Sequence, residues 1–173
     1  QLAALYAGYN QLEILPPEIG DLTNLMSLSL EVNNLRELPD EIGRLQMLTD
    51  LNISMNQLQT VPAAIGDLNS LAVLDLSYNR LQTLPPSIGN LERLHVFDLQ
   101  FNILESLPVE MGQLSRLADL DLSHNVLTEL PASVGTLPNL QRLGLEESGV
   151  SVPDELVNDV AALQRYLRGA ARD

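Results

Sequence analysis

The sequence predicts an α/β solenoid: a right-handed horseshoe with seven parallel strands on its concave face, short 3₁₀ or turn segments on its convex face and a C-terminal capping helix. Three observations predict this fold class. One motif recurs every 23 residues, and inside it a strand-like half precedes a half that contains proline and glycine. The periodicity then ends near residue 148, where a helical pattern begins.

The repeating unit has the frame L-x-x-L-x-L-x-x-N-x-L-x-x-L-P-x-x-I-G-x-L-x-x, which is the pattern of a leucine-rich repeat. Its asparagine recurs every 23 residues without a slip, at Asn10, Asn33, Asn56, Asn79, Asn102 and Asn125. We therefore assign residues 1–148 to a repeat array that contains six full repeats and a seventh strand.

The first half of each unit alternates apolar and variable residues, so we expect a short strand whose leucines point inward and whose variable residues point outward. The asparagine follows the strand, where its amide can bond backbone groups that a turn leaves unpaired. The six asparagines are thus predicted to form a ladder in which each supports its neighbour's turn. In the second half, a proline can open a helical turn and a glycine can close one. That half is too short for a full helix, so we expect 3₁₀ or single-turn segments.

Residues 149–173 depart from the repeat and are predicted to form a C-terminal cap. Ser148 stands where the next asparagine belongs. One face of an amphipathic helix is formed by Leu156, Val160, Leu163 and Leu167. Residues suited to its first turn are Pro153, Asp154 and Glu155, and residues suited to its last turn are Arg165 and Arg168. No similar cap covers the first strand, and the start at Gln1, inside a repeat and without methionine, indicates a fragment or processed form.

Composition limits the classes of function. Nine arginines, no lysine and 23 acidic residues give a net charge of −14, which disfavours nucleic acid and anionic membrane surfaces. The chain has no cysteine, which excludes disulfides, thiolate metal sites and cysteine nucleophiles, and favours a reducing compartment. No apolar run has the length of a membrane span, and no signal peptide is visible. We therefore expect a cytoplasmic protein.

The outward strand positions carry two features that indicate a binding surface. Asp75, Asp98 and Asp121 fall at equivalent positions of consecutive repeats, so we expect them stacked about 4.8 Å apart. They are flanked by Asp50 and Asp119. An apolar and aromatic stripe runs alongside, at Met55, Tyr78, Phe101 and His124, and the first repeat adds Tyr6 and Tyr9. The pattern predicts an acidic, aromatic-edged groove for a basic protein surface. The alternative interpretation is that these aspartates are simply solvated.

Catalytic and metal-binding interpretations are weaker. Asp121, Ser123 and His124 are close in sequence, but a shallow strand surface offers neither a positioned base nor an oxyanion hole. The two histidines fall in different repeats, at opposite ends of their strands, and no loop surrounds the aspartates with carbonyl ligands for calcium. We therefore expect no enzyme activity, no cofactor and no metal.

The 23-residue unit resembles that of the intracellular Ras-group leucine-rich repeat proteins, which include plant Ras-group members, Ras-binding scaffolds and Scribble-like polarity scaffolds. The segment Val152-Pro153-Asp154-Glu155-Leu156-Val157, followed by Ala162, Leu163, Tyr166 and Leu167, is similar to the terminal helix of that group. This resemblance implies a signalling scaffold whose partner is a small GTPase or another protein with a basic patch. The alternatives are the recognition domain of a larger enzyme, such as a Roco-type kinase-GTPase or a bacterial effector ubiquitin ligase, and an exposed bacterial adhesin.

Overall fold

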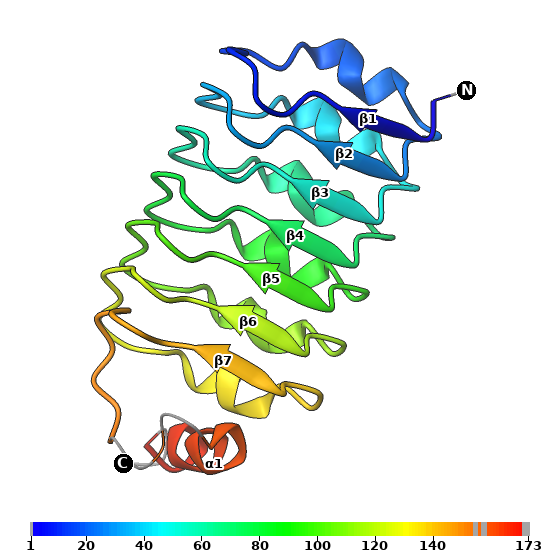
Figure 1. The fold of residues 1–173 in the computed structure, drawn as a ribbon. Coiled ribbons are helices and arrows are strands. Elements are labelled where there is room, and N and C mark those ends of the chain that lie inside the picture. The colour runs from blue at the N-terminus through cyan, green and yellow to red at the C-terminus, as the bar shows by residue number, and fades with distance from the viewer. Residues whose placement is uncertain (1, 154–155, 157–158, 171–173) are drawn as a thin grey trace.

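The computed structural model describes residues 2–153, 156 and 159–170, and it contains one seven-stranded parallel sheet whose strands follow chain order. Figure 1 shows the strands stacked on one side of the molecule and the 3₁₀ segments stacked behind them. The strands are β1 (Ala4–Tyr6), β2 (Ser27–Ser29), β3 (Asp50–Asn52), β4 (Val73–Asp75), β5 (Val96–Asp98), β6 (Asp119–Asp121) and β7 (Arg142–Gly144). The predicted fold class is confirmed.

Each strand contains three residues, and its middle residue packs in or against the core. In β4, Leu74 is fully buried, whereas Val73 and Asp75 are half-buried and face outward. Neighbouring strands pair with an offset of one repeat, so Asp75 lies opposite both Asn52 and Asp98. Because the pairing keeps a single register throughout, equivalent residues of successive repeats form straight columns across the sheet.

The convex side consists of six 3₁₀ segments, namely η1 (Pro17–Asp21), η2 (Asp40–Arg44), η3 (Ala63–Asp67), η4 (Pro86–Asn90), η5 (Val109–Gln113) and η6 (Ala132–Thr136). The repeat proline occupies the N-cap position of each, in an extended conformation, as Pro39 does with φ −70° before η2. The 3₁₀ segments match the sequence-based expectation. The role expected for the repeat glycine does not: Gly43 is the fourth residue of η2 and does not close it, because Arg44 and the cap Leu45 follow.

Close stacking explains the repeat glycine better than turn geometry does. None of these glycines has a positive φ. A Cβ placed on Gly43 would lie 2.6 Å from the carbonyl oxygen of Ala64 and 3.0 Å from its Cβ, in the next repeat. Glycine is therefore needed at this position because the backbone of the neighbouring 3₁₀ segment already fills the space that a side chain would take.

The asparagine side chains connect each turn to the repeat before it. Oδ1 of Asn79 accepts the Leu58 N–H at 2.9 Å, and its Nδ2 donates to the carbonyl of Ile53 at 3.0 Å. The same Nδ2 also donates to Leu76 and Ser77 of its own turn, at 3.1 and 3.2 Å. One buried amide thus satisfies backbone groups of two repeats, which is the condition for burying them.

The asparagine ladder begins at the second repeat. The same bonds to the preceding repeat are made by Asn33, Asn56, Asn102 and Asn125. Asn10 is exposed and bonds only within its own turn, to the carbonyls of Ala7 and Gly8. At the other end, the Ser148 carbonyl accepts the Leu127 N–H at 2.8 Å, and so takes the acceptor role of the missing amide oxygen.

Helix α1 (Val160–Ala170) closes the C-terminal end of the stack. It packs on η6, where Leu163 and Leu167 join the core of the array. The helix begins later than predicted: Asp159 is its N-cap, with Oδ1 accepting the Ala162 N–H at 2.8 Å, and Pro153 lies before it. The predicted first-turn residues Asp154 and Glu155 lie outside the described residues. Of the two predicted last-turn arginines, α1 has only Arg168 in its last turn.

The asparagine ladder predicts the result of Asn79→Ala. Removing this side chain leaves the buried Leu58 N–H without a partner, so we expect a loss of about 1 to 3 kcal/mol in the free energy of unfolding. The carbonyls that Asn79 bonds keep other donors, as Ile53 keeps Asn56 and Leu76 keeps Asn102. Asn10→Ala is the matched control, since it breaks only exposed bonds. Urea unfolding followed by circular dichroism measures both, and equal losses for the two variants would contradict the ladder.

Glycine stacking predicts opposite effects for two Gly→Ala variants. Gly43→Ala should destabilise the protein by roughly 1 to 3 kcal/mol, because the new methyl group overlaps Ala64. Gly169 lies in α1, and apart from its chain neighbours and the helix's own backbone no atom of the described residues lies within 4 Å of its Cβ position, so Gly169→Ala should be neutral or stabilising by up to about 1 kcal/mol. Melting temperatures of the two variants test this, and a Gly43→Ala protein as stable as the parent would disprove the stacking role.

Candidate functional site

The concave face carries the acidic column that the sequence predicts. Asn52, Asp75, Asp98, Asp121 and Gly144 follow one another across β3 to β7. The neighbouring column contains Asp50 and Asp119, on strands that are separated by β4 and β5. The register therefore brings three aspartates side by side and leaves Asp50 apart from them.

These aspartates also stabilise the turns that follow their strands. Oδ1 of Asp75 accepts the Ser77 N–H at 3.0 Å and its hydroxyl at 2.7 Å. Asp98 accepts the Gln100 N–H at 3.0 Å and its side-chain amide at 2.8 Å. Asn52 makes the same bond to the next turn, which shows that the position needs an acceptor rather than a charge. The D-x-S spacing is the signal that could have predicted these Asx turns.

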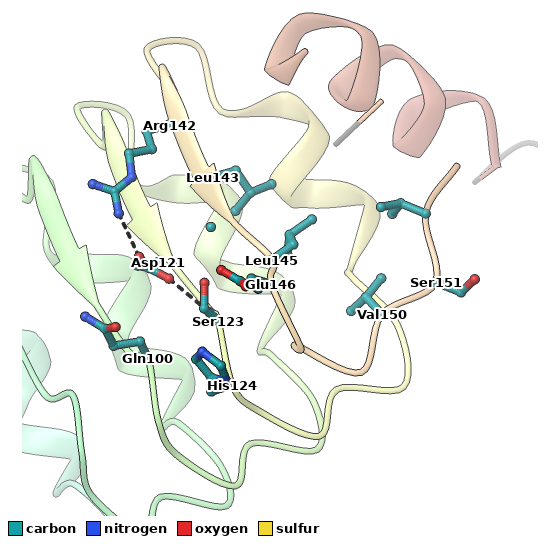
Figure 2. Close-up of a pocket in the computed structure, with 12 residues that line it drawn as sticks. Gln100, Asp121, Ser123, His124, Arg142, Leu143, Leu145, Glu146, Val150 and Ser151 are labelled. Atoms are coloured by element: carbon teal, nitrogen blue, oxygen red, sulfur yellow. Dashed lines mark hydrogen bonds and ion pairs between the residues drawn. The ribbon is translucent and has the colours of Figure 1, made fainter. Parts of the chain in front are cut away.

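An internal cation neutralises one end of the column. Arg142 of β7 donates from Nη2 to Asp121 at 2.8 Å and from Nη1 to Asp119 at 3.4 Å. Asp121 is only 8% exposed and also accepts the Ser123 N–H at 3.0 Å (Figure 2). The carboxylate of Asp121 is therefore occupied within the protein, and the sequence analysis missed this pairing. Within the described chain, Asp50, Asp75 and Asp98 have no cationic partner.

Asp98 lies at the centre of the column, and its environment disfavours its charge. Burial raises the pKa of its carboxyl group above the ordinary value, and the neighbouring carboxylates of Asp75 and Asp121 raise it further. The hydrogen bonds from Gln100 oppose this shift in pKa. A positive charge brought close to Asp98 would relieve both the burial penalty and the repulsion.

The aromatic stripe is a continuous stack over three repeats. The rings of Tyr78 and Phe101 have centroids 4.3 Å apart at 13°, and those of Phe101 and His124 are 4.0 Å apart at 18°. Nδ1 of His124 lies 3.1 Å from Oε2 of Glu147, which extends the row to the seventh repeat. Because the rings cover one another's faces, the stack presents a ridge of ring edges beside the acidic column.

The backbone under this stripe is unusual. All seven residues of the column have positive φ, between 49° and 56°: Tyr9, Val32, Met55, Tyr78, Phe101, His124 and Glu147. Left-handed backbone costs a side-chain-bearing residue about 1 to 2 kcal/mol, and it is most unfavourable for a β-branched residue such as Val32. Since none of the seven is glycine, the residue types at these positions did not predict a left-handed backbone.

Tyr6 and Tyr9 lie away from the three-ring stack. They are 73% and 78% exposed at the N-terminal end, and the column places Val32 and Met55 between Tyr9 and Tyr78. Met55 is itself half exposed. Most of the predicted binding residues thus lie on the repeats of β3 to β6, and the two tyrosines lie apart from them on the first repeat.

A cavity of about 740 Å³ lies at the C-terminal end of the concave face (Figure 2). Polar residues of β6 and β7 line one side, including Asp121, Ser123 and Arg142. Apolar residues line the other, including Leu145, Val150 and Val152. This cavity was not predicted, because it depends on where the chain runs after the last repeat.

The described residues contain no group of three side chains placed to hold a metal ion. No helix in the described part of the chain is both long and apolar enough to cross a bilayer. His124 stacks on Phe101 and its Nδ1 contacts Glu147, whereas Asp121 bonds the Ser123 N–H and Arg142.

The family model described as "Leucine rich repeat" matches residues 23–81 and 92–148, so the chain belongs to the leucine-rich repeat family. Members of this family are generally protein–protein interaction modules. No curated protein sequence gives a significant match.

Solved structures extend the comparison. A leucine-rich repeat protein of Leptospira interrogans is 38% identical with a TM-score of 0.62, over 80% of this chain and 41% of that one. The ectodomain of the Arabidopsis thaliana receptor kinase GASSHO1/SCHENGEN3, in complex with CASPARIAN STRIP INTEGRITY FACTOR 2, is 41% identical with a TM-score of 0.77, over 84% and 18%. The plant peptide hormone receptor RGFR1, in complex with RGF2, is 37% identical with a TM-score of 0.76, over 83% and 24%. The chain thus spans less than half the length of each of these proteins.

The environment of Asp98 predicts a pH-dependent gain of stability in Asp98→Asn. Because folding raises the pKa of Asp98, its ionised form lowers stability above that pKa, and this penalty disappears as the pH falls through it. Asparagine keeps the turn bond, as Asn52 does, without the charge. We expect a higher melting temperature at pH 7 that converges with the parent near pH 3. Asp50→Asn, at an exposed site outside the column, is the control; a gain of equal size there would contradict the explanation.

Proposed function

We propose that this chain is a non-enzymatic protein-binding module of an intracellular signalling scaffold, and that its concave face binds a basic segment of a partner protein. The observation that supports this most strongly is the pair Asp75 and Asp98, whose carboxyl groups lie on adjacent strands beside the Tyr78–Phe101 stack. They have no cationic partner among the described residues.

Electrostatics favour a basic partner and locate its contact. Carboxylates on adjacent strands repel each other by very roughly 1 to 3 kcal/mol at a partly solvated surface, which a lysine or arginine of the partner would relieve. Arg142 already offsets Asp119 and Asp121. The basic group therefore contacts β3 to β5 rather than β6 and β7.

The aromatic ridge supplies the apolar contact. Tyr78 is 44% exposed, and rigid aromatic side chains bury a large area at low entropic cost. The left-handed backbone beneath it would be better served by glycine or asparagine, so large side chains there carry a cost that binding would offset. The bound peptides named for the receptor structures are consistent with a protein or peptide ligand.

The proposal also includes the class of the partner and the cellular location. Resemblance to the Ras-group repeats supports a small GTPase or another signalling protein with a basic patch as partner, and the lack of cysteine supports a cytoplasmic location. The recognition domain of a larger enzyme stays the alternative prediction. No observation favours it over the scaffold.

An affinity capture from source-cell lysate tests the proposed surface at low and moderate salt. The test protein combines Asp75→Ala, Tyr78→Ala, Asp98→Ala and Phe101→Ala. We expect it to retain its partners at least tenfold less well than the parent, and we expect salt to weaken the parent's binding.

The control likewise removes two acidic and two apolar side chains, outside the concave columns. It combines Met47→Ala, Asp67→Ala, Glu92→Ala and Val109→Ala, all at exposed positions. We expect the control to behave as the parent does. Equal capture by the concave variant and the parent would refute the concave-face proposal.

A further inference from the structure

The backbone ladder between repeats follows one rule from β1 to β7. The N–H two residues before the left-handed position donates to the next strand, as Leu122 does to the Gly144 carbonyl at 2.9 Å. The N–H at the left-handed position does the same, as His124 does to Glu146 at 2.7 Å. The carbonyl before each strand accepts two N–H groups, as that of Ala118 does from Gln141 and Arg142. Six successive repeats satisfy all three positions.

At β7 the same three positions have no partner among the described residues. They are the N–H of Leu145, the N–H of Glu147 and the carbonyl of Gln141. Their spacing is that of the preceding ladders, because the three belong to the same repeat frame. The edge of β7 therefore presents an unfilled template for one more parallel strand.

The cavity at the C-terminal end of the concave face reaches this edge. Its volume is about 740 Å³, and it extends from Asp121 on the concave face across Leu143 and Leu145 to the segment with Val150 and Val152. Figure 2 shows Leu143 and Leu145 pointing from β7 toward the segment that carries Val150. Leu143 and Leu145 remain 8% and 9% exposed, whereas Leu120 and Leu122 of the preceding repeat are at 0%. The last repeat thus has an incompletely covered apolar edge.

Helix α1 determines what can occupy this edge. It packs on η6 where a seventh 3₁₀ segment would otherwise stack: the Cβ position of Gly135 lies 3.0 Å from both the Gln164 carbonyl oxygen and the Leu167 Cβ. The Gln164 amide also donates to the Leu137 carbonyl at 2.7 Å. A whole additional repeat, including the first repeat of a second copy, would overlap α1. Only a strand without a helical half fits.

The residues along the edge of β7 determine which side chains an added strand would need. Residues opposite Leu143 and Leu145 would point toward the core beside Val150 and Val152, so they are apolar. The residue opposite Glu146 would lie beside an exposed carboxylate, so it is basic. The residue of the new strand that lies opposite Gly144 would face the concave side. Because Gly144 has no side chain, that residue can be large.

We propose that the edge of β7 binds an extended segment of a partner protein as an eighth, parallel strand, with an apolar–x–apolar–basic pattern read by Leu143, Leu145 and Glu146. The backbone groups of Gln141, Leu145 and Glu147 hold this strand. The site is separate from the β3 to β5 surface and does not depend on the function proposed for it.

A backbone-methylation scan tests the strand geometry without altering the protein. The probe is an acetylated, amidated peptide of threonine, valine, threonine, leucine and arginine, with a fluorophore on an N-terminal linker. In the parallel register, the middle threonine lies opposite Gly144, and its N–H and carbonyl both face β7. N-methylation there should weaken binding at least tenfold in fluorescence polarisation, whereas N-methylation of the valine, whose N–H faces solvent, should change it less than threefold.

Two further measurements locate the site. Peptide binding should slow amide hydrogen exchange at Leu145 and Glu147, which have no partner in the free protein's described part. Glu146→Arg should weaken the arginine peptide and strengthen a matched peptide that ends in glutamate; Asp50→Arg on β3 is the control and should change neither. The proposal is overturned if the probe does not bind at millimolar concentration, if the two methylated peptides bind equally, or if exchange at Leu145 and Glu147 is unchanged.

Discussion

The fold depends on one recurring interaction: a buried asparagine amide that bonds the turn of its own repeat and the backbone of the repeat before it. Through Asn79, this interaction satisfies the Leu58 N–H and the Ile53 carbonyl inside the buried leucine core. The residue before each of these asparagines has a left-handed conformation, as Tyr78 does. The strand side of the array is stable only because each repeat completes the hydrogen bonds of its neighbour.

A constant register turns single residues into surface features. Since each strand pairs with the next at an offset of one repeat, like residues gather in columns, and Asp75 meets Asp98 while Tyr78 stacks on Phe101. The same geometry makes each column sensitive to single residues, because one residue of a different kind on the neighbouring strand changes the charge at the end of the column. Arg142 does this for the acidic column, where it pairs with Asp121.

The two ends of the stack are completed differently. At the C-terminal end, α1 fills the place of a 3₁₀ segment on η6 and leaves the edge of β7 without a partner strand in the described chain. At the N-terminal end, Asn10 lacks a preceding repeat to bond, and Tyr6 and Tyr9 are exposed. A repeat protein shields its core by stacking, so its ends are where unpaired backbone and apolar surface collect.

The sequence by itself determined the repeat length, the strand count and the columns, because a strict period of 23 residues leaves one register that turns the repeat leucines of all the strands to the same side of the sheet. It also located the aspartates and aromatics of the candidate surface. Only the tertiary structure decided which charges are free: Arg142 lies 21 residues from Asp121 and reaches it across the sheet. Likewise, the late start of α1, the left-handed backbone under Tyr78 and the open edge of β7 depend on contacts between repeats, which no local pattern encodes.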